Sequence, residues 1–343
     1  MYIYLQPMKA AFLTTLLLFA SIFTLIAQNL IAVQNGGVPK FFTLLQEAVN
    51  NAQNGDTIFI PGGGFDGVTI NKKIHLIGVG HHPDSTNVTA RTIIPYISLE
   101  SGADNGSLTG IYFPSTINIV YGNINTNINI IQNISGYSIS RCYISKIYDG
   151  AIAANFTFNE NIIGFLSING SNISLNNNLI YNSLSVQYGL VKNNIFLFTN
   201  GNLYNCLVEN NIFNSIFSYN SSSKSIFHNN VKYGVNGILS EYNIQGSGNF
   251  LDDVTLQSIF VNFDPTTMTS GEGVYKADFH LLPNSPYKNA GRDGTDIGIY
   301  GGAFPWKDGS IPSNPHFQTI KIGPKTDTNG SLNVKIKVAA QDH

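Results

Sequence analysis

The fold of the chain is decided by a six-residue phrase whose clearest copy reads Val191-Lys-Asn-Asn-Ile-Phe196. The phrase occurs six times between residues 139 and 232, and each copy begins on an apolar residue and has a polar centre. Its fourth position falls on Cys142, Asn161, Asn178, Asn194, Asn211 and Asn230. The steps between these positions are 19, 17, 16, 17 and 19 residues. Such steps are too long for a coiled-coil heptad and too short for a repeat of paired helices.

A short strand that bends at Asn explains the phrase, because Asn enters the left-handed backbone region more easily than any residue except Gly. One unit of this size cannot bury its own apolar side, so the units must stack on one another. Stacked strands lie about 4.8 Å apart, and at that spacing equivalent Asn side chains hydrogen-bond along the stack. The phrase therefore predicts an all-β parallel solenoid with a column of Asn residues inside it.

Amides, and not charges, carry the polarity of this chain. Asn accounts for 43 of the 343 residues, and 29 of these lie between Asn118 and Asn249, within the expected coils. Charged residues make up only 11%, and the formal net charge is −2. Because there is no basic field, we do not expect nucleic acid as a partner. Simple electrostatic capture of a polyanion is disfavoured for the same reason.

Residues 1–27 are predicted to be a secretory signal peptide, because Lys9 precedes a long apolar run and a cleavage site is expected near Ala27. The alternative is a membrane anchor, since the run is nearly long enough to cross a bilayer. No second apolar run of that length follows. We therefore expect a mature chain without a membrane span that is secreted or exposed at the cell surface.

The solenoid is expected to fill residues 28–250 and to begin with a capping helix. Residues 41–53 place apolar side chains at helical spacing, with Thr43 and Gln46 positioned as a capping box. Asn54-Gly55 is a helix stop, and strands are expected directly after it. A helix here covers the apolar end of the first coil, which water would otherwise reach.

This order of elements resembles the right-handed parallel β-helix proteins of the pectin lyase-like superfamily. The resemblance rests on FTLLQEAVNNAQNGDTIFIPGG from Phe42, VTINKKIHLIGVG from Val68, and the Asn-rich coils that follow, and it spans residues 38–303. It implies a right-handed parallel β-helix with a helical N-terminal cap. It leaves activity open, because that fold carries lyases, hydrolases, adhesins and non-catalytic proteins alike.

Residues 251–310 resemble the closing segment of many secreted bacterial β-helix proteins. The resemblance lies in Asp278-Phe-His-Leu-Leu282 and in the Gly-rich run from Ala290 to Gly302. It implies a C-terminal cap folded over the last coil, in which Arg292, Asp293 and Asp296 are stabilising charges and not catalysts.

The tail, residues 311–343, alternates apolar and polar residues over 317–322 and 332–338, with Thr328-Asn-Gly330 between them. This pattern predicts a C-terminal β-hairpin. Two strands alone are marginally stable, so we expect them to pack on the solenoid or to pair with an exposed edge. A sorting or attachment role at the cell surface is an alternative to simple edge protection.

Catalytic motifs are absent where this fold would carry them. Uronate lyases on the fold resemble one another in an acidic Ca²⁺ cluster beside an Arg or Lys base, and galacturonan hydrolases bring several Asp together. No copy of the phrase contains two carboxylates, and the acidic doublet Asp252-Asp253 falls at the exit from the coils. We therefore expect no metal and no cofactor, and we hold Asp252-Asp253 as the alternative acidic pair.

One column of the phrase is a candidate site. Its second position points outward if the first points inward, which stacks Lys192, Glu209 and His228 on successive coils. This stack is either a surface ion pair of at most about 1 kcal/mol or a polar binding strip for a neutral glycan or another protein. The run His81-His82-Pro83-Asp84 resembles a set of metal ligands, but adjacent residues diverge on extended chain, and we expect a solvated loop.

These observations favour a secreted or surface-exposed, non-catalytic β-helix protein, expected to be monomeric, that presents a polar face to a polysaccharide or a surface partner. The alternative is a polysaccharide lyase or glycoside hydrolase acting on a cell-wall or plant glycan. A third possibility is a purely structural surface protein.

Overall fold

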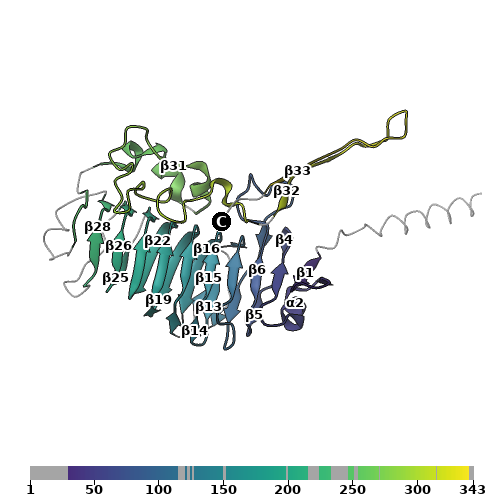
Figure 1. Ribbon diagram of the computed structural model, residues 1–343, viewed down its shortest axis with the longest axis horizontal. Coiled ribbons are helices and arrows are strands. Elements are labelled where there is room, and N and C mark those ends of the chain that lie inside the picture. The colour runs from purple at the N-terminus through teal and green to yellow at the C-terminus, as the bar shows by residue number, and fades with distance from the viewer. Residues whose placement is uncertain are drawn as a thin grey trace, which may run out of the picture.

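The computed structural model describes residues 30–114, 120–121, 124–125, 127–149, 152–197, 200–214, 224–232, 246–250, 254–269, 271–313 and 315–339. The expected signal peptide at 1–27 and the doublet Asp252-Asp253 lie outside these residues. The described chain is nearly all β and forms a parallel β-solenoid of about eight turns (Figure 1). No helix in the described ranges is long and apolar enough to cross a membrane.

Two long sheets run along the solenoid, and each successive coil adds a strand to each sheet. The first sheet contains β2 (Lys40–Phe42), β1 (Ile31–Gln34), β3 (Thr57–Phe59), β6 (His75–Ile77), β9 (Ser107–Thr109), β15 (Ser138–Ser140), β18 (Thr157–Asn159), β21 (Ile173–Asn176), β23 (Gly189–Lys192), β26 (Leu207–Glu209) and β28 (Ile226–His228).

The second sheet contains β4 (Gly63–Gly64), β5 (Val68–Ile70), β7 (Thr92–Ile93), β8 (Ile97–Leu99), β10 (Tyr112–Phe113), β13 (Ile128–Ile130), β16 (Tyr143–Asp149), β19 (Ile162–Ile168), β22 (Leu179–Gln187), β24 (Ile195–Phe196), β25 (Asn200–Tyr204), β27 (Ile212–Phe213) and β29 (Val231–Lys232). A short third sheet is formed by β14 (Ile134–Ser135), β17 (Ala153–Ala154) and β20 (Gly170–Ser171), and β11 (Val120–Tyr121) pairs with β12 (Ile124–Asn125).

The phrase sets the register of the coils, as the sequence predicts. Its first residues pair from one coil to the next, for example Leu175 with Val191 and Val191 with Val208. These residues are fully buried in the core between the sheets. The third position of every copy has a positive φ and makes the bend between sheets: Arg141, Glu160, Asn177, Asn193, Asn210 and Asn229.

The fourth position forms the predicted column of buried Asn side chains. Asn178 donates its side-chain N–H to Oδ1 of Asn194 at 2.9 Å, and Asn194 donates to Oδ1 of Asn211 at 2.9 Å. Each Oδ1 also accepts the backbone N–H of the preceding member, as Asn194 does from Asn178 at 2.9 Å. The column begins where Cys142 N–H donates to Asn161 and continues to Asn249, one coil beyond the predicted copies. Every buried amide in it therefore has partners on the neighbouring coil.

The N-terminal helix is shorter than expected. Helix α2 (Leu45–Asn51) buries Ala48 and Val49, and residues 40–42 form strand β2 instead of the first helical turn. The predicted capping box is wrong, because Leu44 is the N-cap and makes no side-chain hydrogen bond. Gln46 instead bonds the backbone of Thr69 in β5, which fixes α2 against the first coils.

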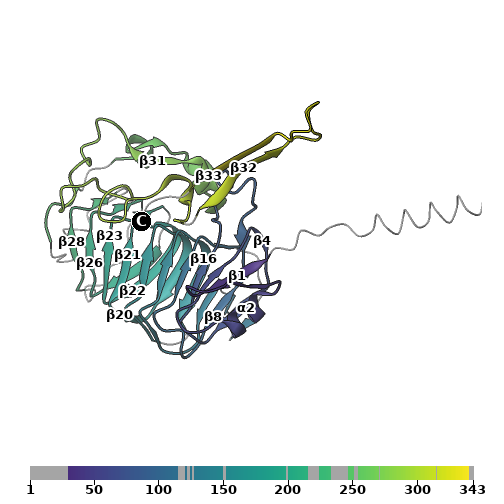
Figure 2. The ribbon, with the colours of Figure 1, turned by 45° about the vertical axis from the view of Figure 1, so that its right-hand side comes forward.

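The described C-terminal segment lies along the side of the coils, whereas the resemblance implied a cap folded over the last coil. Residues 254–313 lie along the outer side of the second sheet and run back toward the first coils (Figures 1 and 2). They contain β30 (Phe260–Asn262), β31 (Asp278–Leu281) and the 3₁₀ turns Leu256–Ser258, Pro265–Thr269, Gly271–Lys276 and Asp308–Ser310. Their apolar side chains build a second core on the fifth position of the phrase: Tyr143, Ile162, Leu179, Ile195, Ile212 and Val231.

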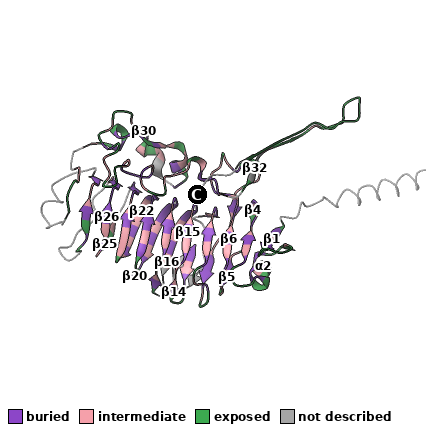
Figure 3. Cartoon of the chain, in the orientation of Figure 1, coloured by how far each residue is buried: buried purple, intermediate pink, exposed green. Residues whose placement is uncertain are grey.

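The predicted C-terminal hairpin is present, but it does not pack on the solenoid. Strands β32 (His316–Ile322) and β33 (Val334–Ala339) pair with each other alone within the described chain. The hairpin projects from the body beside the first coils (Figures 1 and 2), and most of its residues whose burial is described are exposed (Figure 3). The expected contact is missing because the chain just before it is fixed at the corner of the coils, where Ser310 and Ile311 are buried.

We predict that Asn194→Ala lowers the free energy of unfolding by about 2–4 kcal/mol, because it leaves two buried N–H groups of Asn178 without an acceptor. The matched control is Asn159→Ala, whose half-buried side chain accepts one hydrogen bond, from Asn176 Nδ2 at 3.0 Å. Because Asn176 Nδ2 also donates to Ser174 Oγ, we expect the control to cost less than about 1 kcal/mol. Urea unfolding followed by circular dichroism measures both. Equal losses in the two variants would contradict the structural role of the column.

Candidate functional site

The predicted column of Lys192, Glu209 and His228 exists but is not an open surface. The three residues are register partners on β23, β26 and β28. However, the Glu209 side chain is only 8% exposed. It pairs with Arg292, and its Oε2 lies 3.7 Å from Lys192 Nζ. Residues far along the chain therefore cover the centre of the expected binding strip.

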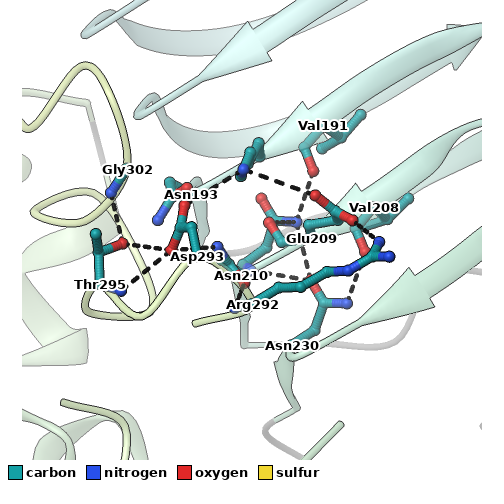
Figure 4. Close-up of polar contacts among 12 residues, drawn as sticks. Val191, Asn193, Val208, Glu209, Asn210, Asn230, Arg292, Asp293, Thr295 and Gly302 are labelled. Carbon is teal, nitrogen blue, oxygen red and sulfur yellow. Dashed lines mark hydrogen bonds and ion pairs between the residues drawn. The ribbon is translucent and has the colours of Figure 1, made fainter. Parts of the chain in front are cut away.

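The covering residues belong to a strap, defined here as residues 290–312. Arg292 and Asp293 of the strap reach the coils side by side (Figure 4), and Asp293 Oδ2 lies 3.3 Å from Lys192 Nζ. His228 is half-buried and accepts a hydrogen bond on Nδ1 from Ser247 N–H at 3.1 Å. The predicted strip is thus mainly an ionic anchor for the strap, which matches the expectation that Arg292 and Asp293 are stabilising charges.

The bend residues of the coils hold the rest of the strap. Asn229 donates to the carbonyl of Ala290, Asn193 to that of Gly298, and Asn177 to that of Gly301. At the other end, Arg141 Nη1 donates to the carbonyl of Ile311 at 3.0 Å. Because each third-position side chain leaves the bend pointing outward, a stack of coils offers a row of polar groups, which are donors at Arg141 and the Asn residues and an acceptor at Glu160. The strap follows this row from the last coils back to the first.

A cavity of about 310 Å³ remains where the strap passes the rest of the C-terminal segment. Ile162 and Leu179 on the outer face of the second sheet lie at its base. Its polar and aromatic lining comes from three separate stretches: His82 and Asp84; Tyr275, Asp278 and His280; Tyr300, Trp306 and Asp308. None of these residues belongs to the predicted strip.

A stacked pair forms one wall of the cavity. The His280 ring lies on the Tyr300 ring, with centroids 3.7 Å apart and planes 19° from parallel. His280 Nδ1 and Asp278 Oδ1 are 2.7 Å apart, and Tyr300 O–H donates to Asp308 Oδ1 at 2.8 Å. Each ring is therefore held by a carboxylate.

The pKa shifts of the lining residues determine which protonation states the cavity presents at neutral pH. Desolvation acts to raise the pKa of Asp278, but hydrogen bonds from the His280 backbone and ring outweigh it and lower the pKa overall. Burial, aided by the bond to Asp308, raises the pKa of Tyr300 well above its ordinary value. Burial also lowers the pKa of His82. The cavity thus presents an ionised Asp278, a neutral Tyr300 hydroxyl and a neutral His82.

Tyr275 is positioned by a cluster beneath the cavity. Its hydroxyl lies 2.8 Å from His81 Nδ1, and the Arg91 guanidinium lies 5.4 Å from the centre of its ring. Arg91 makes a bidentate pair with Glu272, at 2.9 and 3.1 Å. The expectation of a solvated loop at 81–84 is wrong for His81, which is fully buried because the C-terminal segment covers it.

The cavity combines hydrogen-bond acceptors with flat aromatic surface. In the described ranges, no group of three or more His, Cys, Asp or Glu is arranged to hold a metal ion. Carboxylates at the cavity wall accept hydrogen bonds from hydroxyl groups, and charged acceptors make the stronger bonds. Half-buried aromatic rings supply a flat apolar surface beside them.

We predict that the pair of Glu209 and Arg292 anchors the strap with a coupling energy of about 1 kcal/mol, since Arg292 is 53% exposed and solvent weakens the pair. The test is a double-mutant cycle of Glu209→Gln and Arg292→Gln, followed by thermal unfolding at low and high salt. The coupling is expected to shrink at 1 M salt. Additive effects of the two substitutions at low salt would show that the contact does not hold the strap.

A scan of the chain against protein-family models finds no match, and a search of curated proteins finds no similar sequence. No relative therefore supplies a function for the cavity. Its role has to be argued from the residues that line it.

Proposed function

We propose that this is a secreted or surface-exposed, non-catalytic β-helix protein of the pectin lyase-like type that binds a neutral polysaccharide in the cavity between the strap and the second sheet. The observation that carries the proposal is the combination of Trp306, the stacked His280 and Tyr300, and the carboxylates Asp278 and Asp308 around one opening. Trp306 is the only tryptophan in the chain.

A sugar ring has an apolar face and a rim of hydroxyl groups, and the cavity has a counterpart for each. Trp306 and Tyr300 offer ring surface, and both are half-buried, so one part of each remains accessible. Asp278 and Asp308 offer acceptors for hydroxyl groups. Ile162 and Leu179 keep the base of the cavity apolar, which favours a ligand that leaves little charge inside it.

The charges of the cavity select against acidic glycans. Three carboxylates belong to its described lining, namely Asp84, Asp278 and Asp308, and that lining contains no lysine or arginine. A polyuronate would place its own carboxylates beside these groups without a cation to offset the repulsion. We therefore propose a neutral glycan and not a uronate as the ligand, although the resemblance of the coils is to proteins that include pectin lyases.

Catalysis is the alternative that the same test separates. Hydrolysis needs a carboxyl group that stays protonated to act as an acid, and such groups have raised pKa values. Asp278, which faces the opening, has a lowered pKa instead. Binding without turnover is the proposal that fits this carboxylate better than hydrolysis does.

Because Trp306 is the sole tryptophan, its fluorescence reports directly on the cavity. We expect a saturable change in emission when the protein is titrated with a neutral oligosaccharide, and none with oligogalacturonate. Asp308→Asn is expected to weaken binding at least about tenfold, since a hydrogen bond to a charged group contributes about 1.5–3 kcal/mol. Trp306→Ala, followed by calorimetry, is expected to abolish binding.

The matched control is Phe304→Ala, which removes an exposed ring from the same stretch outside the cavity lining and is expected to leave affinity unchanged. Reducing ends and unsaturated products are measured in the same mixtures. Binding that survives both Trp306→Ala and Asp308→Asn would place the ligand elsewhere. Product release lost in Asp308→Asn would replace the binding proposal with an enzyme.

A further inference from the structure

The C-terminal ribbon, residues 316–339, carries an interaction surface that the solenoid does not use. Its two strands are antiparallel, and the register pairs Phe317 with Val338, Ile320 with Ile336, and Ile322 with Val334. Cross-strand partners share a face of a two-stranded sheet. These six apolar residues therefore form one continuous face.

A β-bulge keeps this face continuous. With strict alternation, Phe317 would lie on the same side as Lys321, four residues away. The register shifts between Phe317 and Thr319, and the extra residue returns Phe317 to the apolar side opposite Val338. All six side chains remain between 42% and 62% exposed. The ribbon thus arranges six large apolar groups on one side and leaves them in solvent.

The other face of the ribbon does not stabilise it. Lys321 lies directly opposite Lys335, and the next pair along is Thr319 with Lys337. Like charges placed opposite one another oppose strand pairing. An isolated two-stranded ribbon is marginal in water even without such repulsion, so burial of the apolar face has to supply its stability.

The solenoid of the same chain is poorly placed to cover that face. Arg141 holds the carbonyl of Ile311, and Pro312 packs against Gly110. Strand β32 begins at His316, only four residues after Pro312. This short, anchored connection directs the ribbon away from the coils (Figure 2).

We propose that the apolar face of the ribbon binds the same face of a second copy of this chain, to give a two-fold symmetric dimer. This departs from the monomer expected from the sequence. A fully exposed aromatic residue presents roughly 200 Å² and the smaller aliphatic residues present less, so six residues that are about half exposed offer at most about 600 Å² per copy. Two facing ribbons then bury at most about 1,200 Å², the lower end of the range for a specific interface.

Charge placement favours a second copy over a lipid surface. When two apolar faces pack about 10 Å apart, Lys321, Lys335 and Lys337 of both copies point outward into water and away from one another. A ribbon lying on an anionic membrane by its apolar face would point the same lysines away from the phosphates. The arrangement is also self-complementary, as a two-fold interface requires.

The test uses the full chain with Ile336→Cys. Ile336 belongs to the central pair of the face, so its counterpart across a two-fold axis is close. Both native cysteines are buried, which leaves the new thiol as the reactive one. We expect a bifunctional maleimide that spans about 10 Å, the distance between facing sheets, to give a covalently linked dimer at micromolar concentration. The matched control is Lys335→Cys, which lies one residue away on the opposite face. We expect it to give at least tenfold less cross-linked dimer.

Analytical ultracentrifugation of the wild type without cross-linking measures its oligomeric state and completes the test. We expect a dimer that Ile320→Lys converts to a monomer, with unchanged thermal unfolding of the coils, whereas Lys337→Ser leaves the dimer intact. A wild type that stays monomeric at all concentrations would overturn the proposal, as would equal cross-linking of the two cysteine variants. Co-sedimentation of the monomer with phosphatidylglycerol vesicles, lost in Ile320→Lys, would replace the second copy with a membrane.

Discussion

The buried Asn column is the constraint on which the structure depends, because a buried amide without a partner costs about 1–3 kcal/mol. From Asn178 onward, each Oδ1 in the column accepts both a backbone and a side-chain N–H from the preceding coil, as Asn211 does from Asn194. A coil that slipped by one residue would lose both bonds and turn its apolar residues outward. The column therefore fixes the register of neighbouring coils more sharply than apolar burial alone would, and it tolerates coils of different lengths because the variation falls in the loops.

The bend next to this column also determines what happens outside the coils. With the third residue at positive φ, its side chain points away from the core, and the fifth residue faces outward on the second sheet. At the third position, Asn177 and Asn193 therefore point outward and hold the strap. At the fifth position, Ile195 and Ile212 pack against the C-terminal segment. One short phrase thus encodes the interior of the solenoid and the docking surface for a segment that follows it much later in the chain.

The sequence predicted the repeated coils, but it did not predict the features that form by contact between distant segments of the chain. The phrase was sufficient for the coils, their register and the Asn column, because each rests on neighbours 16 to 19 residues apart. The alternation of side chains correctly placed Glu209 on the outer face of its strand. However, Glu209 is not exposed to solvent, because Arg292, which is 83 residues later in the sequence, covers it. The cavity was missed because His82, His280 and Trp306 meet only after the strap docks. One available signal was the fifth position of the phrase, which is apolar in all six copies although it faces outward.

The origin of the cavity walls links the proposed ligand binding to the docking of the strap. Trp306 and Asp308 lie on the strap, whereas Asp278 and His280 lie on β31, so an undocked strap would leave only half of the site. Under the proposed function, a ligand that bridges both walls would bind the docked state alone, and its stabilisation of that state would grow with the logarithm of ligand concentration above Kd. The solenoid contributes rigidity, because the strap is bonded to residues on successive coils whose spacing is fixed by the buried column. The cavity is thus preorganised by the buried core of the coils, and for the proposed ligand this would lower the ordering cost that an isolated loop of the same sequence would meet on binding.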